Sequence, residues 1–154
     1  MTEGEAMIDH LLTRPVTSLG LRSPVCVAPD ARVNQAVVGM REHGQGAVLV
    51  LSEEGELQGL FTERDLLYRV DEGDRDFTER RISTFMQKNP TTISPTQTIA
   101  DAIAMMDKGG FRHLPIIDAK KGPLGIVSVG DVLTHLVEAF PEVFVNLPPN
   151  PRSY

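Results

Sequence analysis

One nine-residue pattern occurs twice in the chain, as GLFTERDLL at residues 59–67 and as GIVSVGDVL at residues 125–133. In both copies a glycine precedes two apolar residues and a hydroxyl residue, and an aspartate follows three positions after the hydroxyl. When residues 23–68 are aligned with residues 89–134, no gap is needed and eight pairs are identical: Pro24/Pro90, Pro29/Pro95, Ala36/Ala102, Met40/Met106, Gly44/Gly110, Gly59/Gly125, Asp65/Asp131 and Leu67/Leu133. Self-similarity at a fixed period indicates a duplicated structural unit, so we expect two copies of one fold unit.

Each copy predicts the same order of secondary structure. A short strand near residues 25–27 or 91–93 precedes a helix whose apolar residues recur at steps of three and four, namely Val33, Val37 and Met40, or Ile99, Ile103 and Met106. Two strands and a second helix complete each copy, at 47–51, 58–62 and 65–70, or at 114–117, 124–128 and 131–139. In the second copy, Thr98 and Asp101 have the spacing of a capping box and Gly109-Gly110 ends the helix. We therefore predict a mixed α/β (α+β) fold of two β-α-β-β-α units.

The length of the chain favours two units that share a core, because a half of about 75 residues is marginally stable alone. We expect an N-terminal arm, a first unit, a charged linker, a second unit and a Pro-rich tail, at 1–13, 14–70, 71–81, 82–138 and 139–154. Apolar residues at helical spacing in the arm fit a helix packed on the body or on a partner chain, and a frayed terminus fits equally well. The charged sequence of the linker is typical of a solvated surface segment. The NLPPNP sequence in the tail is typical of an extended arm.

Charge and composition argue against several classes of protein. The chain has a net charge of −6, so it lacks the excess of basic residues that is typical of a nucleic-acid-binding protein. The N-terminus lacks an export signal and no run of about 18 apolar residues occurs, so we expect a soluble cytoplasmic protein without membrane contact. The single cysteine, Cys26, cannot form an intramolecular disulfide, and its apolar neighbours predict a buried position in a strand. Histidines at metal-binding spacing, a P-loop and a dinucleotide motif are all missing from the sequence, so we expect neither a metal site nor an enzyme.

The repeated Thr62-x-x-Asp65 and Ser128-x-x-Asp131 corners lie where a predicted strand meets a predicted helix. Both fit a capping box, in which the hydroxyl and the carboxylate accept hydrogen bonds from backbone N–H groups. The same corner suits a nucleotide, because a carboxylate accepts from ribose hydroxyls and a helix N-terminus favours phosphate. The two roles are compatible.

The doubled corner motif, the FRHLPIID sequence before its second copy and the order of the elements together resemble a tandem pair of CBS (cystathionine-β-synthase-type) domains, or Bateman module, over residues 14–138. The resemblance implies two units packed about a pseudo-twofold axis, with two clefts that take adenosyl ligands such as AMP, ADP, ATP or S-adenosylmethionine. It also implies a regulatory role and a homodimer. We expect a module without an obligatory cofactor that senses such a ligand and signals in trans to an unknown protein. A ligand-free structural dimer or adaptor is the alternative.

The resemblance further implies roles for single residues. Asp65 and Asp131 would hold ribose, with Thr62 and Ser128 near phosphate. Arg112 and His113 stand at the corner from which relatives point a basic side chain at phosphate, although His113 equally fits a partly buried histidine at a strand edge. The full set of expected ligand-binding residues, with Val25 and Thr91 near the adenine, is Val25, Thr62, Arg64, Asp65, Thr91, Arg112, His113, Pro115, Ser128, Gly130 and Asp131.

Overall fold

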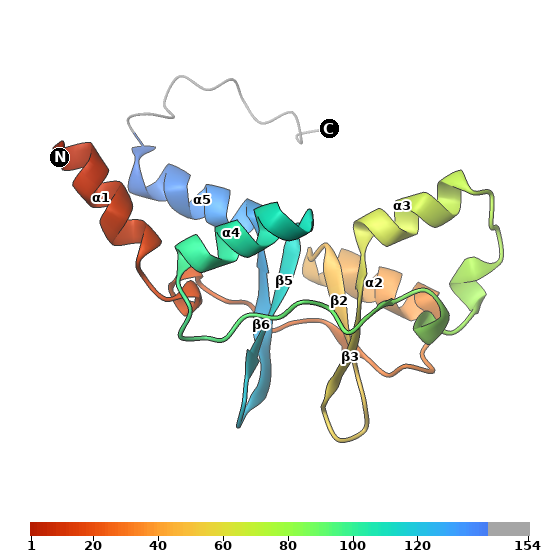
Figure 1. The fold of residues 1–154 in the computed structure, drawn as a ribbon. Coiled ribbons are helices and arrows are strands. Elements are labelled where there is room, and N and C mark those ends of the chain that lie inside the picture. The colour runs from red at the N-terminus through yellow and green to blue at the C-terminus, as the bar shows by residue number, and fades with distance from the viewer. Residues whose placement is uncertain (142–154) are drawn as a thin grey trace.

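The computed structural model describes residues 1–141, which form two similar halves side by side (Figure 1). The first half contains β1 (Cys26–Val27), α2 (Val33–His43), β2 (Ala47–Leu51), β3 (Leu57–Thr62) and α3 (Glu63–Asp71). The second half contains α4 (Ile99–Gly109), β5 (His113–Asp118), β6 (Gly122–Ser128) and α5 (Val129–Ala139). The remaining elements are helix α1 (Glu3–Leu12), strand β4 (Gln87–Lys88) and the short 3₁₀ helices η1 (Val16–Leu19), η2 (Phe77–Glu79) and η3 (Ile82–Thr84). The predicted mixed fold of two repeated units is confirmed.

The sheet pairing repeats along with the sequence. In the first half, β1 runs parallel to β2, and β2, β3 and β4 are antiparallel neighbours. In the second half, β5 and β6 form an antiparallel pair, and the strand predicted at 91–93 is reduced to one parallel bridge between Ile93 and Ile116. That bridge is the counterpart of the Val27–Val50 pair in the first half. A register irregularity also occurs in both halves at matching positions, after Val50 and after Ile116.

The two halves share apolar packing through strand β2, which is buried on both faces. Val48 and Val50 face the core that α2 covers, while Ala47 and Leu49 face the opposite side. Successive side chains of a strand point to opposite faces, so this alternation places β2 between two layers. On the second side Leu49 and Leu60 form a central cluster to which Ile126 of β6 contributes. The expected shared core is therefore present.

The chain also exchanges short segments between its halves. Val16 of η1, at the start of the first repeat, lies in the core of the second half with Ile99 and Leu114. Ile82 of η3, at the start of the second repeat, lies in the core of the first half. Matching backbone hydrogen bonds fix both segments, from Val16 N–H to Gln97 O at 2.8 Å and from Ile82 N–H to Ala31 O at 2.8 Å. Each half is completed by residues that precede the other half in the sequence.

Burial differs from what the sequence pattern suggests at three places. Cys26 is exposed, because β1 is a two-residue edge strand with β2 as its neighbour. Ile103 is 36% exposed, because Ala102 and Met106 form the buried stripe of α4. The charged segment after α3 is not wholly solvated, because Phe77 is 4% exposed and packs in the first core.

The N-terminal arm lies within the described residues, whereas the Pro-rich sequence near the C-terminus does not. Residues 3–12 form helix α1, which packs on the second half through the buried side chain of Leu11. The Pro-rich sequence at 146–151 lies outside the described residues. Within residues 1–141, no helix combines the length and the apolar character needed to span a bilayer.

Candidate functional site

Both predicted corners form complete capping boxes. In the first half, Thr62 caps α3: its N–H donates to Asp65 Oδ2 at 2.9 Å, and its side chain accepts from the Asp65 N–H. In the second half, Ser128 caps α5 in the same way, with 2.8 Å from its N–H to Asp131 Oδ2. Each corner stands where a strand ends and a helix begins, so the N–H groups of that helix face the space beside it.

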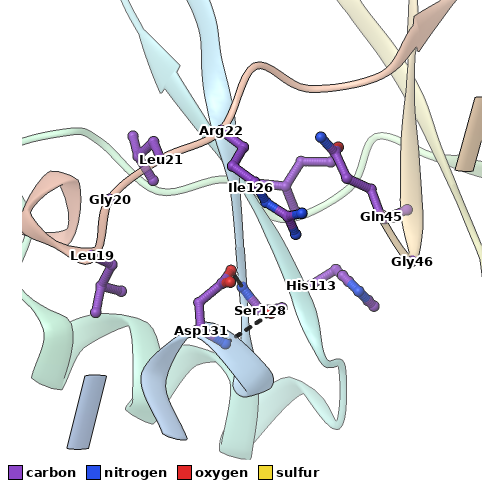
Figure 2. A pocket seen from close by; sticks show the side chains of 11 residues that line it. Leu19, Gly20, Leu21, Arg22, Gln45, Gly46, His113, Ile126, Ser128 and Asp131 are labelled. Carbon is purple, nitrogen blue, oxygen red and sulfur yellow. Dashed lines mark hydrogen bonds between the residues drawn. The ribbon is translucent and has the colours of Figure 1, made fainter. Parts of the chain in front are cut away.

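The Asp131 corner opens on a narrow cleft between the halves (Figure 2). One wall comes from the second half and carries His113, Ile126, Ser128 and Asp131, and the other comes from Leu19–Arg22 and Gln45–Ala47. The cleft encloses about 50 Å³, whereas pockets for small ligands typically enclose about 300–1,000 Å³. At this volume the cleft is too small for an adenosine.

Arg22 supplies the permanent cation of the Asp131 cleft. Figure 2 shows its side chain reaching into the space above Asp131. The Nη1 group donates long hydrogen bonds to the carbonyl oxygens of His43, at 3.4 Å, and Gly44, at 3.5 Å. Gln45, just after α2, holds the segment that contains Arg22, because its side-chain amide donates a hydrogen bond to Ser23 O at 2.8 Å. This cation was not among the predicted residues.

The Thr62–Asp65 corner adjoins a second, larger cleft, here called the Asp65 cleft. Its lining comes from both halves, and its volume of about 430 Å³ is in the range of small-molecule pockets. The lining residues are Leu60, Thr62, Glu63, Arg64, Leu67, Gln87, Gly109, Gly110, Phe111, Arg112 and His113. A hollow that continues past Gln87 is lined by Lys88, Asn89, Pro90 and Thr91.

Two predicted arginines, Arg64 and Arg112, line the Asp65 cleft. Arg64 comes from the first turn of α3, and its Nη1 donates to Gly110 O at 3.4 Å, across the boundary between the halves. Arg112 precedes β5 in the other half and is exposed. Among residues 1–141, no ion pair involves either guanidinium. Arg64 and Arg112 thus line the same cleft from different halves.

The carboxylate of Asp65 is covered on the cleft side by Gln87 of β4. Gln87 Nε2 donates to Asp65 Oδ1 at 3.2 Å and to Asp65 Oδ2 at 3.0 Å. Thr62 adds a hydroxyl hydrogen bond to Oδ2 at 3.0 Å. Gln87 lines the cleft, whereas Asp65 does not. Leu21 lies 66 positions before Gln87, just outside the aligned repeats, and Asp131 lines its own cleft.

His113, the first residue of β5, lines both clefts. Its ring extends toward Gly46, where a Cβ atom would lie 3.2 Å from His113 Nε2 and 3.1 Å from Glu63 Oε2. Burial lowers the pKa of His113, and Arg112 adds to this effect, while Glu63, Asp131 and Asp65 oppose it. The imidazole is therefore neutral at physiological pH and sits between the two acidic corners.

The other predicted residues lie at different distances from the clefts. Thr91 lines the hollow beyond Gln87. Gly130 is exposed in the first turn of α5, near Ser128. Pro115 is buried within β5, and Val25 packs against the first core.

Sequence reasoning missed Arg22, Gln87 and Lys88. One signal was available for two of them, because Arg22 and Lys88 are basic residues at matching positions of the repeat. In the part of the chain that the structure describes, no group of three or more His, Cys, Asp or Glu side chains is placed to hold a metal ion.

A family model described as the CBS domain matches the chain twice, at residues 16–72 and 82–138. The chain is 32% identical over 106 residues to the CBS domain-containing protein YhcV of Bacillus subtilis, a match that covers 69% of this chain and 74% of that protein. In four curated relatives, two of them described as CBS domain-containing proteins, the match covers from 54% to 74% of the relative's own length.

Solved structures give the same result. The CBS-domain containing protein ATU1752 from Agrobacterium tumefaciens superposes with a TM-score of 0.71 at 31% identity, over 79% of this chain and 98% of that chain. The CBS domain protein PAE2072 from Pyrobaculum aerophilum, complexed with AMP, superposes with a TM-score of 0.72 at 18% identity, over 83% and 99% of the two chains. The second likeness is one of fold.

Proposed function

Since the chain belongs to the CBS domain family, with one domain in each repeat, we propose that it is a regulatory module that binds an adenosine nucleotide in the Asp65 cleft. Occupancy of the cleft changes how the two halves are held together, and a protein partner responds to that change. The observation that supports this proposal is that Arg64 and Arg112, which come from different halves, line one cleft of about 430 Å³ beside the N-terminus of α3.

The positions of the positive charges indicate where the phosphate group of the ligand would lie. A phosphate needs cationic or N–H donors, and a surface with a net charge of −6 supplies few of them elsewhere. Arg64 and Arg112 offer two guanidinium groups, and the first turn of α3 adds backbone N–H groups. Lys88 in the adjoining hollow offers a third cation to a longer phosphate chain. The ribose then lies toward Asp65, and the adenine lies in the hollow near Thr91.

The likeness to PAE2072 supports the class of ligand, because that protein of the same fold is described in complex with AMP. The Asp131 cleft is the second candidate position for a ligand, but Arg22 would have to move and the cleft would have to widen. We therefore place the first ligand in the Asp65 cleft.

Calorimetric titration of AMP into protein freed of carried-over ligand tests the proposal. Replacing Arg112 by Ala removes one charge-assisted contact to phosphate, so AMP should bind about tenfold more weakly, the lower end of the range for hydrogen bonds to charged groups. Adenosine, which has no phosphate, should bind both proteins equally. The control is Arg41→Ala, an exposed arginine of α2 that does not line either cleft. Absence of AMP binding, or an unchanged affinity in Arg112→Ala, would contradict the proposal.

One observation favours a second function, that of a ligand-free structural adaptor. Both capping boxes are complete without any ligand, and Asp65 is fully engaged by Thr62 and Gln87. In this alternative the two aspartates act as helix caps. It predicts a melting temperature that does not change with AMP, ADP, ATP or S-adenosylmethionine.

We further propose that the chain forms a homodimer through α3 and α5. Both helices expose apolar side chains, with Leu67 67% exposed on α3 and Leu133 56% exposed on α5. These two leucines are repeat counterparts, and the same patch on a second copy would supply the matching surface of a twofold interface. An apolar groove between α4 and α5 adjoins Leu133.

A further inference from the structure

The two acidic corners have the same backbone geometry, but their carboxylates meet different neighbours. Asp65 accepts two hydrogen bonds from Gln87 Nε2, whereas Asp131 accepts from the Ser128 N–H within its own capping box. The residue 66 positions before Gln87 is Leu21, which has no side-chain donor. Within residues 1–141, no side chain from outside the capping box donates to the Asp131 carboxylate, although Arg22 reaches into the space above it (Figure 2).

The geometry points to Gln87 as a residue that sets the nucleotide affinity of the Asp65 cleft, because its amide occupies the carboxylate that the ribose hydroxyls of the ligand need. This inference rests on the proposed binding of an adenosine nucleotide in that cleft. Gln87 then acts as an internal competitor of the ribose and raises the nucleotide concentration at which the cleft fills.

The competition follows from the acceptor capacity of Asp65. Its two oxygens already accept from the Thr62 N–H and the Thr62 hydroxyl as well as from Gln87. A vicinal diol brings two more donors that need the same oxygens on the cleft side. Ribose binding therefore exchanges the Gln87 hydrogen bonds for its own, and the net gain is smaller than at an open carboxylate.

Gln87 is suited to this role because its side chain can leave without disturbing the fold. It is exposed, and β4 is held to β3 by backbone pairing between Gln87 and Leu60. Substitution of an exposed side chain usually changes stability by less than about 0.5 kcal/mol. A substitution of Gln87 should therefore change the affinity for the ligand without a large change in the stability of the fold.

The experiment compares AMP with 2′,3′-dideoxy-AMP, which keeps the base and the phosphate but lacks the diol. Gln87→Leu reproduces the repeat counterpart of this position, and Gln87→Ala removes the amide without adding an apolar side chain. In both variants AMP should bind about tenfold more tightly than in the natural protein, on the scale of one hydrogen bond to a charged group. The affinity for 2′,3′-dideoxy-AMP should stay within about twofold.

The matched control is Gln58→Leu, the same substitution at an exposed position of β3 that lies outside the Asp65 cleft. It should leave both affinities unchanged. If AMP binds Gln87→Leu and Gln87→Ala no more tightly than the natural protein, Gln87 does not compete with the ribose and the inference fails. An equal gain for both nucleotides would show steric gating instead, which also overturns it. If neither nucleotide binds any of the four proteins, the proposed function itself fails and takes the inference with it.

Discussion

At the scale of single residues, the sequence located the acidic corners and Arg112 but not their neighbours. Thr62 and Asp65 lie at the two ends of a four-residue stretch, and a capping box is a local structure that a short pattern specifies. Gln87 and Arg22 reach the clefts on segments that cross between the halves, so their positions depend on tertiary packing. Residues contributed by non-local segments are the part of the site that a repeat pattern did not reveal.

His113 carries a prediction about pH, because burial lowers its pKa below the ordinary value of about 6.5. Between the lowered pKa and about 6.5, the unfolded chain binds more protons at this side chain than the folded chain does. The free energy of unfolding should therefore decrease as the pH falls through about 6.5. The variant His113→Gln lacks this contribution, so its stability should decrease less between about pH 7.5 and 5.5, measured by urea unfolding. Parallel pH curves for the two proteins would contradict the role of burial at His113.

At the scale of elements, hydrophobic periodicity and cap signals predicted the helices well. Thr98 caps α4 and Gly110 ends it with a φ of 68°, as the local sequence indicates. The first strands were less predictable, because their length depends on the neighbour: β1 pairs with β2 over two residues, while its counterpart makes one bridge at Ile93. The burial of Phe77 in a charged segment is also a tertiary effect, since α2 packs against η2.

The proposed dimer is an element-scale prediction, because it rests on the apolar faces of α3 and α5. Leu133→Asp places a charge in the middle of the proposed interface, where its desolvation opposes association. Light scattering should show that the natural protein is a dimer and that this variant is a monomer at the same concentration. The variant Thr134→Asp, at the next position of α5, which is also exposed, should remain a dimer. A monomeric natural protein, or a dimeric Leu133→Asp, would contradict the proposed interface.

At the scale of the whole molecule, the exchange of η1 and η3 makes the two repeats one folding unit. The duplication predicted two copies and a shared core, and the structure adds that each copy is incomplete without a segment from the beginning of the other. The central cluster of Leu49, Leu60 and Ile126 joins the halves a second time. A ligand that alters the boundary between the halves therefore acts on a surface that both cores support, which is what a regulatory module requires.

This arrangement predicts that a substitution in one repeat destabilises the core of the other. Ile82 belongs to the second repeat by sequence but is fully buried in the first core, beside Val33 and Phe61. Ile82→Ala leaves a cavity there and should lower the free energy of unfolding by about 2–5 kcal/mol. Hydrogen exchange should show that amides of α2 and β2 lose protection together with those of α4 and β5, because the two cores unfold in one cooperative step. Loss of protection confined to residues 82–138 would mean that the repeats are independent and that the exchanged segments do not couple them.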